Sequence, residues 1–411
     1  MTLKSLIKKI TPNFVLSVYR LLKAYRNEIR YKITVRTLVK NVDVYNVLFF
    51  LEISSLWKYH HLYNLLKKSN YFKPTIVVCP NITKSSSDML RIMYETYNDM
   101  LSNGYNVLLG YNEETQEYIN VRNLNPHIIF FTNSWEFYLD KRFHIKEYSD
   151  VLTCYMNYSF VTTPHKWSFA TEVSTNVWRY FQECEEYNRI LKQWTPGRNA
   201  LVTGYPMYDE FVHSNAEGKD WKKKESTLKR VIYAPHHSIF SDGFIALSTF
   251  LIHAEAMLEI TKLYKDKIQF VFKPHPHLRN NLYKHSDWGV EKTDNYYNSW
   301  INGENTAFVN GEYIDLFKSS DAMIHDCSSF TVEYLYTKKP VCFLSNIGDE
   351  GQANEVALRA YDAHYKAKTK ADICIFLDNV VIGGVDEKLE ERECFYNEVL
   401  LPFNSGEQCY L

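Results

Sequence analysis

Short apolar runs that alternate with longer helical patterns are the sequence feature that most restricts the fold of this chain. From residue 44 onward, each run has the length of a buried strand, and most runs are followed by a stretch with helical periodicity. Predicted strands lie at 46–51, 75–79, 106–110, 127–131, 151–155 and 199–203, and again at 230–234, 268–272, 306–309, 321–325 and 340–344. This alternation is typical of an α/β protein with a parallel sheet covered by helices on both faces.

The alternation is interrupted by a polar and charged stretch at 214–229, which has the composition of a linker. A chain of 411 residues also exceeds what one compact core usually holds. We therefore expect two doubly wound, Rossmann-like domains that face a cleft, the first at 41–215 and the second at 228–385. Residues 386–411 are expected to form a closing helix and tail.

Charge is distributed unevenly along the chain. Residues 1–40 contain ten Lys and Arg and one acid, Glu28, which gives +9, so the remaining residues carry −10. Apolar residues recur in this segment at helical spacing, at Val15, Val18, Leu22, Tyr25 and Ile29. The pattern is typical of a basic amphipathic helix that lies on an anionic membrane surface. The alternative is a helix that packs its apolar stripe on the body of the protein itself.

Other compositional features limit the cellular setting. The formal charge of −1 gives no indication of nucleic-acid binding. The eight cysteines are scattered without a CxxC pair, and no apolar run is long enough to span a bilayer or to form a secretory signal. We expect a cytoplasmic protein with reduced thiols, peripheral to the inner face of the cell membrane.

Polar residues follow three predicted strands of the second domain. Pro235, His236 and His237 follow the strand at 230–234, Lys273, His275 and His277 follow the strand at 268–272, and Asp326, Ser328 and Ser329 follow the strand at 321–325. Because the carboxyl ends of neighbouring parallel strands meet at one edge of a sheet, we expect these segments to face one pocket.

The chemistry of these residues suits a phosphate. Ser328 and Ser329 precede a predicted helix at 329–337, where a serine cap and first-turn amides would form an anion site; a cap without a ligand is the alternative. The histidines could bind phosphate, relay protons or bind a metal. Lys273 would be either a phosphate partner or a solvated surface residue. No metal site is predicted, because the accompanying carboxylates lack a recognisable ligand spacing.

Taken together, the segments resemble the motifs of the CDP-glycerol glycerophosphotransferase family, whose members make teichoic-acid-type polymers of bacterial surfaces. The matching stretches are 203–209, 233–235, 272–275, 313–317 and 326–329, followed by Glu333 and by Lys339 and Pro340. The resemblance covers residues 200–345 by motif and residues 41–200 by architecture alone.

This resemblance implies a GT-B fold whose second domain holds the nucleotide-linked donor. The implied reaction moves glycerol phosphate or ribitol phosphate from a CDP-polyol to a lipid-linked or glycan acceptor and releases CMP, in synthesis of a capsule, a teichoic-acid-like polymer or another surface polysaccharide. The residues implied in donor binding are Pro235, Lys273, Asp326, Ser328, Ser329, Thr331 and Glu333. His236, His237 and His275 are the implied catalytic residues. The resemblance implies no particular cofactor, and the only candidate is a Mg²⁺ ion brought by the substrate.

Two departures from the family pattern leave the donor and the general base open. The stretch 155–160 has no histidine where the family carries a candidate base, so Tyr158, His165 or another group would have to serve. The stretch 233–238 carries His236 and His237 where the polymerases more often have Thr-Trp-Arg. Weak candidates for the acceptor side, all after strands of the first domain, are Glu52, Trp57 and Lys58, and likewise Asn133, Trp135 and Glu136.

Three other functions remain open on the sequence alone. A nucleotide-sugar glycosyltransferase of capsule or lipopolysaccharide synthesis could use the same fold, and so could a sugar-nucleotide epimerase. The absent first-domain histidine also allows a non-catalytic scaffold of a glycan assembly complex.

Overall fold

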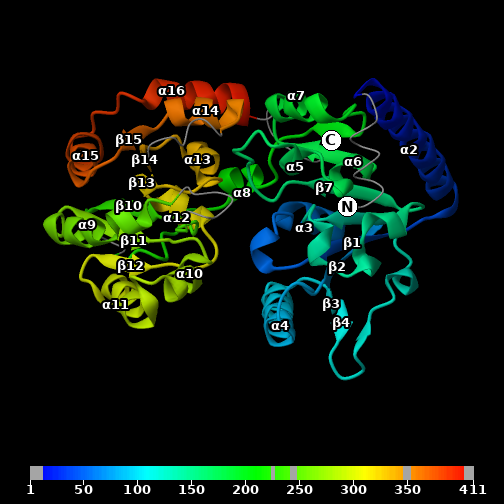
Figure 1. Ribbon diagram of the computed structural model, residues 1–411, viewed down its shortest axis with the longest axis horizontal. Helices are drawn as coiled ribbons and strands as arrows, with labels where there is room; N and C mark the ends of the chain where they lie inside the picture. The colour runs from blue at the N-terminus through cyan, green and yellow to red at the C-terminus, as the bar shows by residue number, and fades with distance from the viewer. Residues whose placement is uncertain (1–12, 224–226, 241–247, 346–352, 402–411) are drawn as a thin grey trace. The chain divides into compact units, whose positions relative to one another are not determined.

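The computed structural model describes residues 13–223, 227–240, 248–345 and 353–401. They form two compact units: unit 1 contains residues 13–158 and 165–207, and unit 2 contains residues 159–164 and 208–401 (Figure 1). The chain therefore enters unit 2 once for a short segment, 159–164, before it returns to complete unit 1. Residues 1–12 of the basic segment and residues 402–411 of the tail lie outside the described residues.

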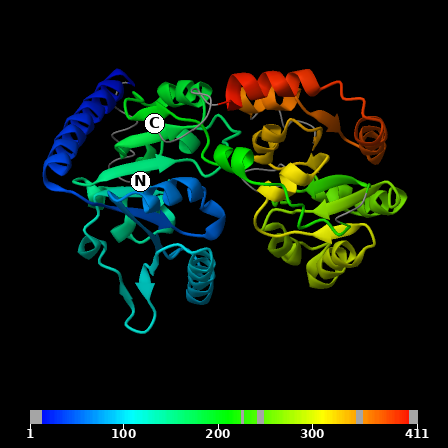
Figure 2. The ribbon, with the colours of Figure 1, turned by 180° about the vertical axis from the view of Figure 1, so that it is seen from behind.

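Unit 1 is built on a parallel sheet with the strand order β3-β2-β1-β6-β7-β8-β9. Its strands are β1 (Tyr45–Leu51), β2 (Phe72–Val78), β3 (Val107–Leu109), β6 (Ile128–Phe131), β7 (Leu152–Met156), β8 (Arg179–Gln182) and β9 (Ala200–Val202). Its helices are α2 (Asn13–Asn41), α3 (His60–Lys68), α4 (Ser86–Ser102), α5 (Lys166–Phe169), α6 (Glu172–Asn176) and α7 (Glu185–Trp194). A small antiparallel hairpin, β4 (Tyr111–Asn112) and β5 (Glu117–Tyr118), extends from unit 1 in both ribbon views (Figures 1 and 2).

Unit 2 repeats this plan with the strand order β12-β11-β10-β13-β14-β15, again all parallel. Its strands are β10 (Lys229–Ala234), β11 (Ile268–Phe272), β12 (Thr306–Phe308), β13 (Ala322–His325), β14 (Val341–Leu344) and β15 (Tyr365–Ala367). Its helices are α8 (Tyr208–His213), α9 (Phe250–Leu263), α10 (Leu278–Lys284), α11 (Gly289–Asn302), α12 (Ile314–Ser319), α13 (Phe330–Glu333), α14 (Glu355–Asp362), α15 (Lys370–Ile375) and α16 (Leu389–Phe395). The prediction of two doubly wound α/β units is therefore confirmed.

Aromatic side chains fill the core of each unit. In unit 1, Phe49 of β1 stacks on Phe130 of β6 with ring centroids 4.9 Å apart. In unit 2, Phe272 of β11 stacks on Trp300 of α11 at 5.0 Å, and Tyr233 of β10 stacks on Trp300 at 5.8 Å. These contacts lie between neighbouring strands or between a strand and its covering helix, so they fix the sheet edges from which the polar loops emerge.

The final passage into unit 2 occurs earlier in the chain than the linker composition indicated. Helix α8 lies before the polar stretch at 214–229, yet it belongs to unit 2. Its Phe211 stacks on Tyr336 at 5.0 Å and lies 6.3 Å from Phe317 of α12. Tyr208 of the same helix also lies 5.9 Å from Tyr336, and these aromatic contacts, which linker composition does not reveal, hold α8 to unit 2.

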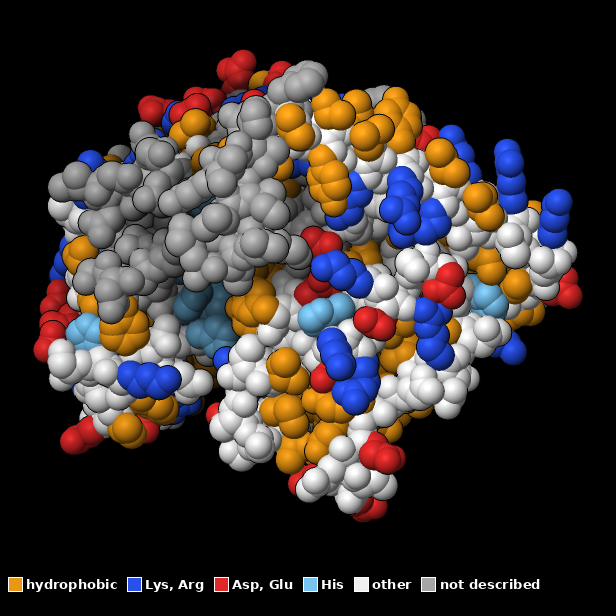
Figure 3. All heavy atoms as spheres, turned by 45° about the vertical axis from the view of Figure 1, so that its right-hand side comes forward, with side chains coloured by type: hydrophobic (Ala, Val, Ile, Leu, Met, Phe, Trp, Pro, Cys, Tyr) orange, Lys and Arg blue, Asp and Glu red, His pale blue; other side chains and the backbone are white. Residues whose placement is uncertain are grey.

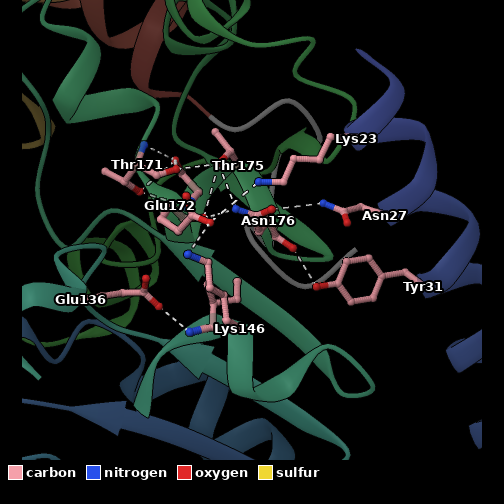
Figure 4. Close-up of polar contacts among 11 residues, drawn as sticks. Lys23, Asn27, Tyr31, Glu136, Lys146, Thr171, Glu172, Thr175 and Asn176 are labelled. Atoms are coloured by element: carbon pink, nitrogen blue, oxygen red, sulfur yellow. Dashed lines mark hydrogen bonds and ion pairs between the residues drawn. The ribbon is translucent and has the colours of Figure 1, made fainter. Parts of the chain in front are cut away.

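The described part of the basic segment, from Asn13 onward, lies in helix α2 along one side of the unit 1 sheet (Figures 1 and 2). Tyr31 is its buried anchor: the hydroxyl donates to Asn176 O at 2.8 Å and lies 2.8 Å from Thr153 Oγ1 (Figure 4). Glu28 forms an ion pair with Arg198 at 2.6 Å. Helix α2 therefore docks on unit 1 through a largely polar face.

The apolar stripe of α2 is largely exposed, although its Tyr25 packs against Arg198 of unit 1, 4.0 Å from the ring centroid. Val15, Val18, Leu22, Tyr25 and Ile29 are between 38% and 63% exposed. Figure 3 shows hydrophobic and basic side chains interspersed along the side of unit 1 that α2 covers. The alternative in which this stripe packs on the protein itself is met at Tyr25 alone of these five residues, and membrane association stays a prediction. No helix in the described part of the chain is long and apolar enough to cross a membrane.

Candidate functional site

Three neighbouring strand ends of unit 2 meet at one edge of its sheet. β10 lies between β11 and β13, so the segments that follow these strands emerge side by side. The amide of His275 donates to Pro235 O at 3.0 Å, and the amide of His236 donates to Asp326 Oδ1 at 2.5 Å. The strand order reverses between β10 and β13, which is where doubly wound sheets bind ligands. The three segments singled out in the sequence are thus brought together.

His236, His237 and His275 form a compact cluster at this edge, called the histidine cluster below. The ring of His237 stacks on that of His275 with centroids 4.1 Å apart. The ring of His236 lies 4.3 Å from His237 and 5.3 Å from His275. His277 is exposed at the rim, 5.4 Å from His275.

Burial keeps the histidine cluster uncharged at neutral pH. It lowers the pKa of His236 to about 3, of His237 to about 4 and of His275 to about 2, and neighbouring imidazoles lower each pKa further. The positive charge of Lys273 also contributes to the low pKa of His275. Neutral imidazoles can donate N–H groups to a phosphate or bind a metal, but they do not themselves add positive charge.

Asp326 is fully buried and positions the loop that carries His236. Its Oδ2 accepts hydrogen bonds from the amide and the hydroxyl of Thr249, at 2.5 and 2.9 Å, while Oδ1 accepts the amide of His236. Burial raises the pKa of Asp326 to about 6, and these hydrogen bonds oppose the rise. The carboxylate of Asp326 ties β13 to the His236 loop and the start of α9, and a contact between Asp326 and the donor stays a prediction.

Ser328 and Ser329 lie at the partly exposed start of α13, but neither serine side chain caps the helix. The predicted helix at 329–337 is a single turn, Phe330–Glu333, followed by a 3₁₀ turn. The Ser328 hydroxyl lies 2.6 Å from that of Thr162. The Ser329 hydroxyl makes no hydrogen bond to any residue that the structure describes, so it is available to a ligand. The predicted serine cap is therefore wrong, and so short a helix offers little dipole.

Three further side chains predicted to bind the donor are buried and engaged within unit 2. Lys273 Nζ donates to Gly311 O at 2.8 Å, and Thr331 Oγ1 donates to Cys327 O at 3.0 Å. Glu333 accepts the hydroxyl of Tyr313. These polar atoms of Thr331 and Glu333 stabilise the start of α13 from within, and donor binding by the two residues stays a prediction. The Pro235 carbonyl accepts the amide of His275, and Pro235 has no polar side chain to offer a ligand.

His325 is a core residue although it belongs to the polar motif. It is the last residue of β13, and both of its ring nitrogens are buried without a hydrogen-bond partner in the part of the chain that the structure describes. Its ring lies 5.4 Å from Phe343 and 5.3 Å from His364. Burial lowers the pKa of His325 well below its ordinary value.

Several residues that support this site were not found from the sequence. Thr162 reaches Ser328 from the segment 159–164, and Asn354 holds that segment by donating its amide to Thr162 O at 2.8 Å. Ser238 Oγ lies 2.8 Å from His236 Nδ1. No motif marks Thr162 or Asn354, because their role depends on a chain crossing that only the fold reveals. Ser238 directly follows the two histidines and could have been singled out.

A second polar cluster lies at the carboxyl edge of the unit 1 sheet. Glu52 follows β1 and accepts hydrogen bonds from Asn81, after β2, at 2.5 Å and from Asn133, after β6, at 2.9 Å. These three strands are adjacent, and the strand order reverses between β1 and β6. The amide groups fix the Glu52 carboxylate at the topological switch of this sheet.

The structure places the other predicted residues of the first domain in different surroundings. Trp57 belongs to the core: its indole donates to Tyr105 Oη at 3.0 Å, and its ring packs on Phe49 at 5.3 Å. Its predicted acceptor-side role is therefore corrected. Lys58 is partly exposed and stays a prediction. Burial raises the pKa of Tyr158, and the nearby Tyr138 and Glu52 add to the rise, which is the opposite of what a phenolate base requires.

The other candidates around this edge lie among aromatic and buried groups. His165, the other candidate base, stacks on Trp167 with ring centroids 5.3 Å apart. Trp135 lies 5.3 Å from the same Trp167. Glu136 accepts the amide of Ile145, and burial raises its pKa. Asn133 is the one of this group that contacts Glu52.

Comparison with known protein families finds a match for the middle of the chain, which begins in unit 1 and covers much of unit 2. Residues 175–346 match the family described as CDP-glycerol:poly(glycerophosphate) glycerophosphotransferase, and this stretch includes the whole histidine cluster. A curated relative, the minor teichoic acid biosynthesis protein GgaB of Bacillus subtilis (strain 168), is 30% identical over 157 residues. The match covers 35% of this chain and 15% of GgaB, so the chain spans only a small part of that relative's length.

Solved structures resemble the chain over most of its length. A variant of the wall teichoic acid polymerase TagF has a TM-score of 0.56 at 14% identity and matches 95% of this chain and 94% of its own. The UDP-GlcNAc 2-epimerase from Neisseria meningitidis bound to UDP-GlcNAc has a TM-score of 0.51 at 14% identity, over 86% and 95% of the two chains. At these identities the likeness shows the fold alone, and it confirms the predicted GT-B fold class.

Proposed function

Over residues 175–346 the chain belongs to the CDP-glycerol:poly(glycerophosphate) glycerophosphotransferase family, and from this premise we propose that it transfers a polyol phosphate. The donor is CDP-glycerol or CDP-ribitol, and the acceptor is a hydroxyl of a lipid-linked or glycan polymer. The attacking oxygen forms a bond to the β-phosphorus while the bond from that phosphorus to the bridging oxygen breaks, and CMP leaves. The product is a surface polymer of the teichoic-acid or capsule type.

The observation that carries this proposal is the convergence of β10, β11 and β13 on the histidine cluster. The cluster supplies imidazole groups, and Ser329 follows a neighbouring strand at the same edge of the sheet, at the topological switch where the fold places ligands. Phosphoryl transfer asks a protein chiefly to position the reacting groups and to stabilise charge on the phosphate oxygens. Fixed N–H and O–H donors can perform both tasks.

Within unit 2 the side chains divide into ligand-facing and supporting groups. His237, His275 and Ser329 are proposed to donate hydrogen bonds to the donor diphosphate, and His236 to stabilise the departing CMP. Lys273 adds positive charge from its buried position beside Gly311 O. Asp326 supports His236 through the backbone amide. For the general base, Glu52 is proposed, because two amide groups already hold its carboxylate at the edge of the unit 1 sheet.

A place at the membrane surface is proposed from the geometry of α2. The helix docks on unit 1 through Tyr31 and Glu28 and leaves an apolar stripe exposed. Along the same helix, Arg20, Lys23, Arg26, Arg30, Lys32, Arg36 and Lys40 supply positive charge. Such a surface suits the cytoplasmic face of an anionic membrane, where a lipid-linked acceptor would be found.

The donor assignment is tested by incubating the purified chain with CDP-glycerol or CDP-ribitol and a glycan acceptor, and measuring CMP. We expect acceptor-dependent CMP release with one of these donors. His275→Ala and Ser329→Ala should each lower kcat/KM by roughly 10²–10³-fold, the usual cost of removing a donor aimed at a developing negative charge. His285→Ala, a histidine of unit 2 that stacks on Phe240 away from the motifs, is the matched control.

Two results would redirect the assignment. Turnover of a nucleotide-sugar without CMP release from either CDP-polyol would favour a glycosyltransferase of the same fold. A surface polymer that persists in cells carrying both His275→Ala and Ser329→Ala would instead favour a non-catalytic scaffold.

A further inference from the structure

We infer that His236, His237 and His275 form a binding site for a divalent transition-metal ion of the Zn²⁺ class. One ring nitrogen from each residue lies within 4.8 Å of those of the other two. Three imidazoles bound to a tetrahedral ion with Zn–N bonds of about 2.0–2.1 Å have their nitrogens about 3.4 Å apart. The rings therefore need only a small inward movement to surround one ion.

The two loops that carry these rings are held in place by their backbones. The amide of His275 donates to Pro235 O at 3.0 Å, which joins the loops to each other. The amide of His236 donates to Asp326, and Asn281 of α10 donates to His237 O at 2.9 Å. Because these bonds fix the loops, the three rings are already gathered before any ion binds, and a metal site gains affinity from such preorganisation.

The ring nitrogens also have the environment that a metal ligand requires. His237 Nδ1 is buried and has no hydrogen-bond partner among the described residues, a state that carries an energetic cost unless a ligand satisfies it. His236 Nδ1 is engaged by Ser238: it lies 2.8 Å from the Ser238 hydroxyl and accepts the Ser238 backbone amide at 3.3 Å. These contacts orient the His236 ring, as outer-shell partners commonly orient a histidine ligand.

The ligand set determines which ion fits. Three imidazole nitrogens suit Zn²⁺, Co²⁺, Ni²⁺ and Cu²⁺, whereas Mg²⁺ prefers oxygen ligands in a near-octahedral shell. Mg²⁺, the ion considered from the sequence, is therefore a poor match for the cluster. Three protein ligands also leave a coordination position for a phosphate oxygen, the arrangement of catalytic rather than structural zinc sites. Only this last role rests on the proposed function, because the ion site itself is independent of any substrate.

The site can be tested by titrating Co²⁺ into the full-length, tag-free protein after treatment with EDTA, in the absence of substrate. We expect one Co²⁺ per chain, a visible absorption band of a nitrogen-bound ion, and displacement by Zn²⁺. His237→Gln and His275→Gln, which keep a hydrogen-bond donor but lose an imidazole ligand, should weaken binding by more than ~100-fold. Ser238→Ala, which keeps all three ligands, should weaken it by ~10–100-fold, the usual cost of removing an outer-shell partner.

The outcomes separate a metal site from a plain phosphate site. His285→Gln is the matched control and should bind Co²⁺ like the wild type. Absence of stoichiometric Co²⁺ binding, or equal binding by the wild type and the folded His275→Gln variant, would overturn the metal site. Because the titration contains no donor, failure of the polyol-phosphate transferase assignment would leave a positive Co²⁺ result unchanged.

Discussion

At the scale of single residues, the sequence identified the right segments but not the role of each side chain. The rule that polar residues after neighbouring parallel strands share one edge correctly grouped His236, His237 and His275. The same rule gave no means of separating exposed groups from buried ones. Asp326 and Glu333 turn inward because Thr249 and Tyr313, both distant in sequence, supply hydrogen bonds there. Such partners are visible only once the fold is known.

The buried pair of His325 and His364 predicts a pH-dependent stability. Burial lowers the pKa of His364 to about 3 and that of His325 well below the ordinary value, near 6.5, that an unfolded chain retains. The unfolded state therefore binds more protons below pH 6.5, so the free energy of unfolding is greatest above pH 6.5 and falls as the pH drops toward 3.

The change that tests this is His325→Phe, which removes one buried imidazole and keeps a planar ring. Urea unfolding at pH 7, 6, 5 and 4 should show a dependence on pH that is shallower by up to ~1.4 kcal/mol per pH unit. His285→Phe, at a partly exposed position of the same unit, should leave the slope unchanged. Equal slopes for His325→Phe and the wild type would show that His325 does not stay neutral in the folded state.

At the scale of helices and strands, apolar runs predicted eleven strands that are all present with small shifts of their ends. The prediction missed the short hairpin strands β4 and β5 and, within the two parallel sheets, β8 and β15. β8 begins with Arg179, and β15 has only three residues with Lys366 at its centre, so neither forms a clear apolar run. Helix α2 was predicted as amphipathic, but its docking through Tyr31 could not be foreseen, because the partners Thr153 and Asn176 lie far along the chain.

The exposed stripe of α2 predicts membrane attachment through this one element. Leu22→Glu places a charge in the stripe and should weaken binding to vesicles of phosphatidylglycerol and phosphatidylcholine by at least ~10-fold, since burial of a leucine is worth about 1.5–3 kcal/mol. Ser17→Glu makes the same change of charge on the same helix outside the stripe. Ser17→Glu should lose only the electrostatic part of the binding free energy, about 1 kcal/mol, which weakens vesicle binding roughly fivefold.

Vesicle co-sedimentation measures both variants, and circular dichroism confirms that they fold. Similar losses for Leu22→Glu and Ser17→Glu would mean that charge alone attaches the protein. Unchanged binding of Leu22→Glu would remove α2 from the membrane contact.

At the scale of the whole molecule, the near-zero net charge hides a division between a basic helix and an acidic remainder. The basic helix presents an apolar stripe that suits a membrane, while unit 2 gathers Lys273, the histidine cluster and Ser329 at one sheet edge. This edge is the central element of the proposed function, because it is the place where a CDP-linked donor would be held. The duplicated doubly wound plan was predictable from the repeated alternation, whereas the excursion of 159–164 into unit 2 was not.

The most direct test of this account is a crystal structure of the chain with bound CDP-glycerol. We expect the diphosphate oxygens to lie within hydrogen-bond distance of the histidine cluster, or to coordinate one metal ion that the cluster holds. We also expect Ser329 to donate a hydrogen bond to the same diphosphate. A nucleotide bound away from the carboxyl ends of β10, β11 and β13, with the histidine cluster left without a ligand, would contradict it.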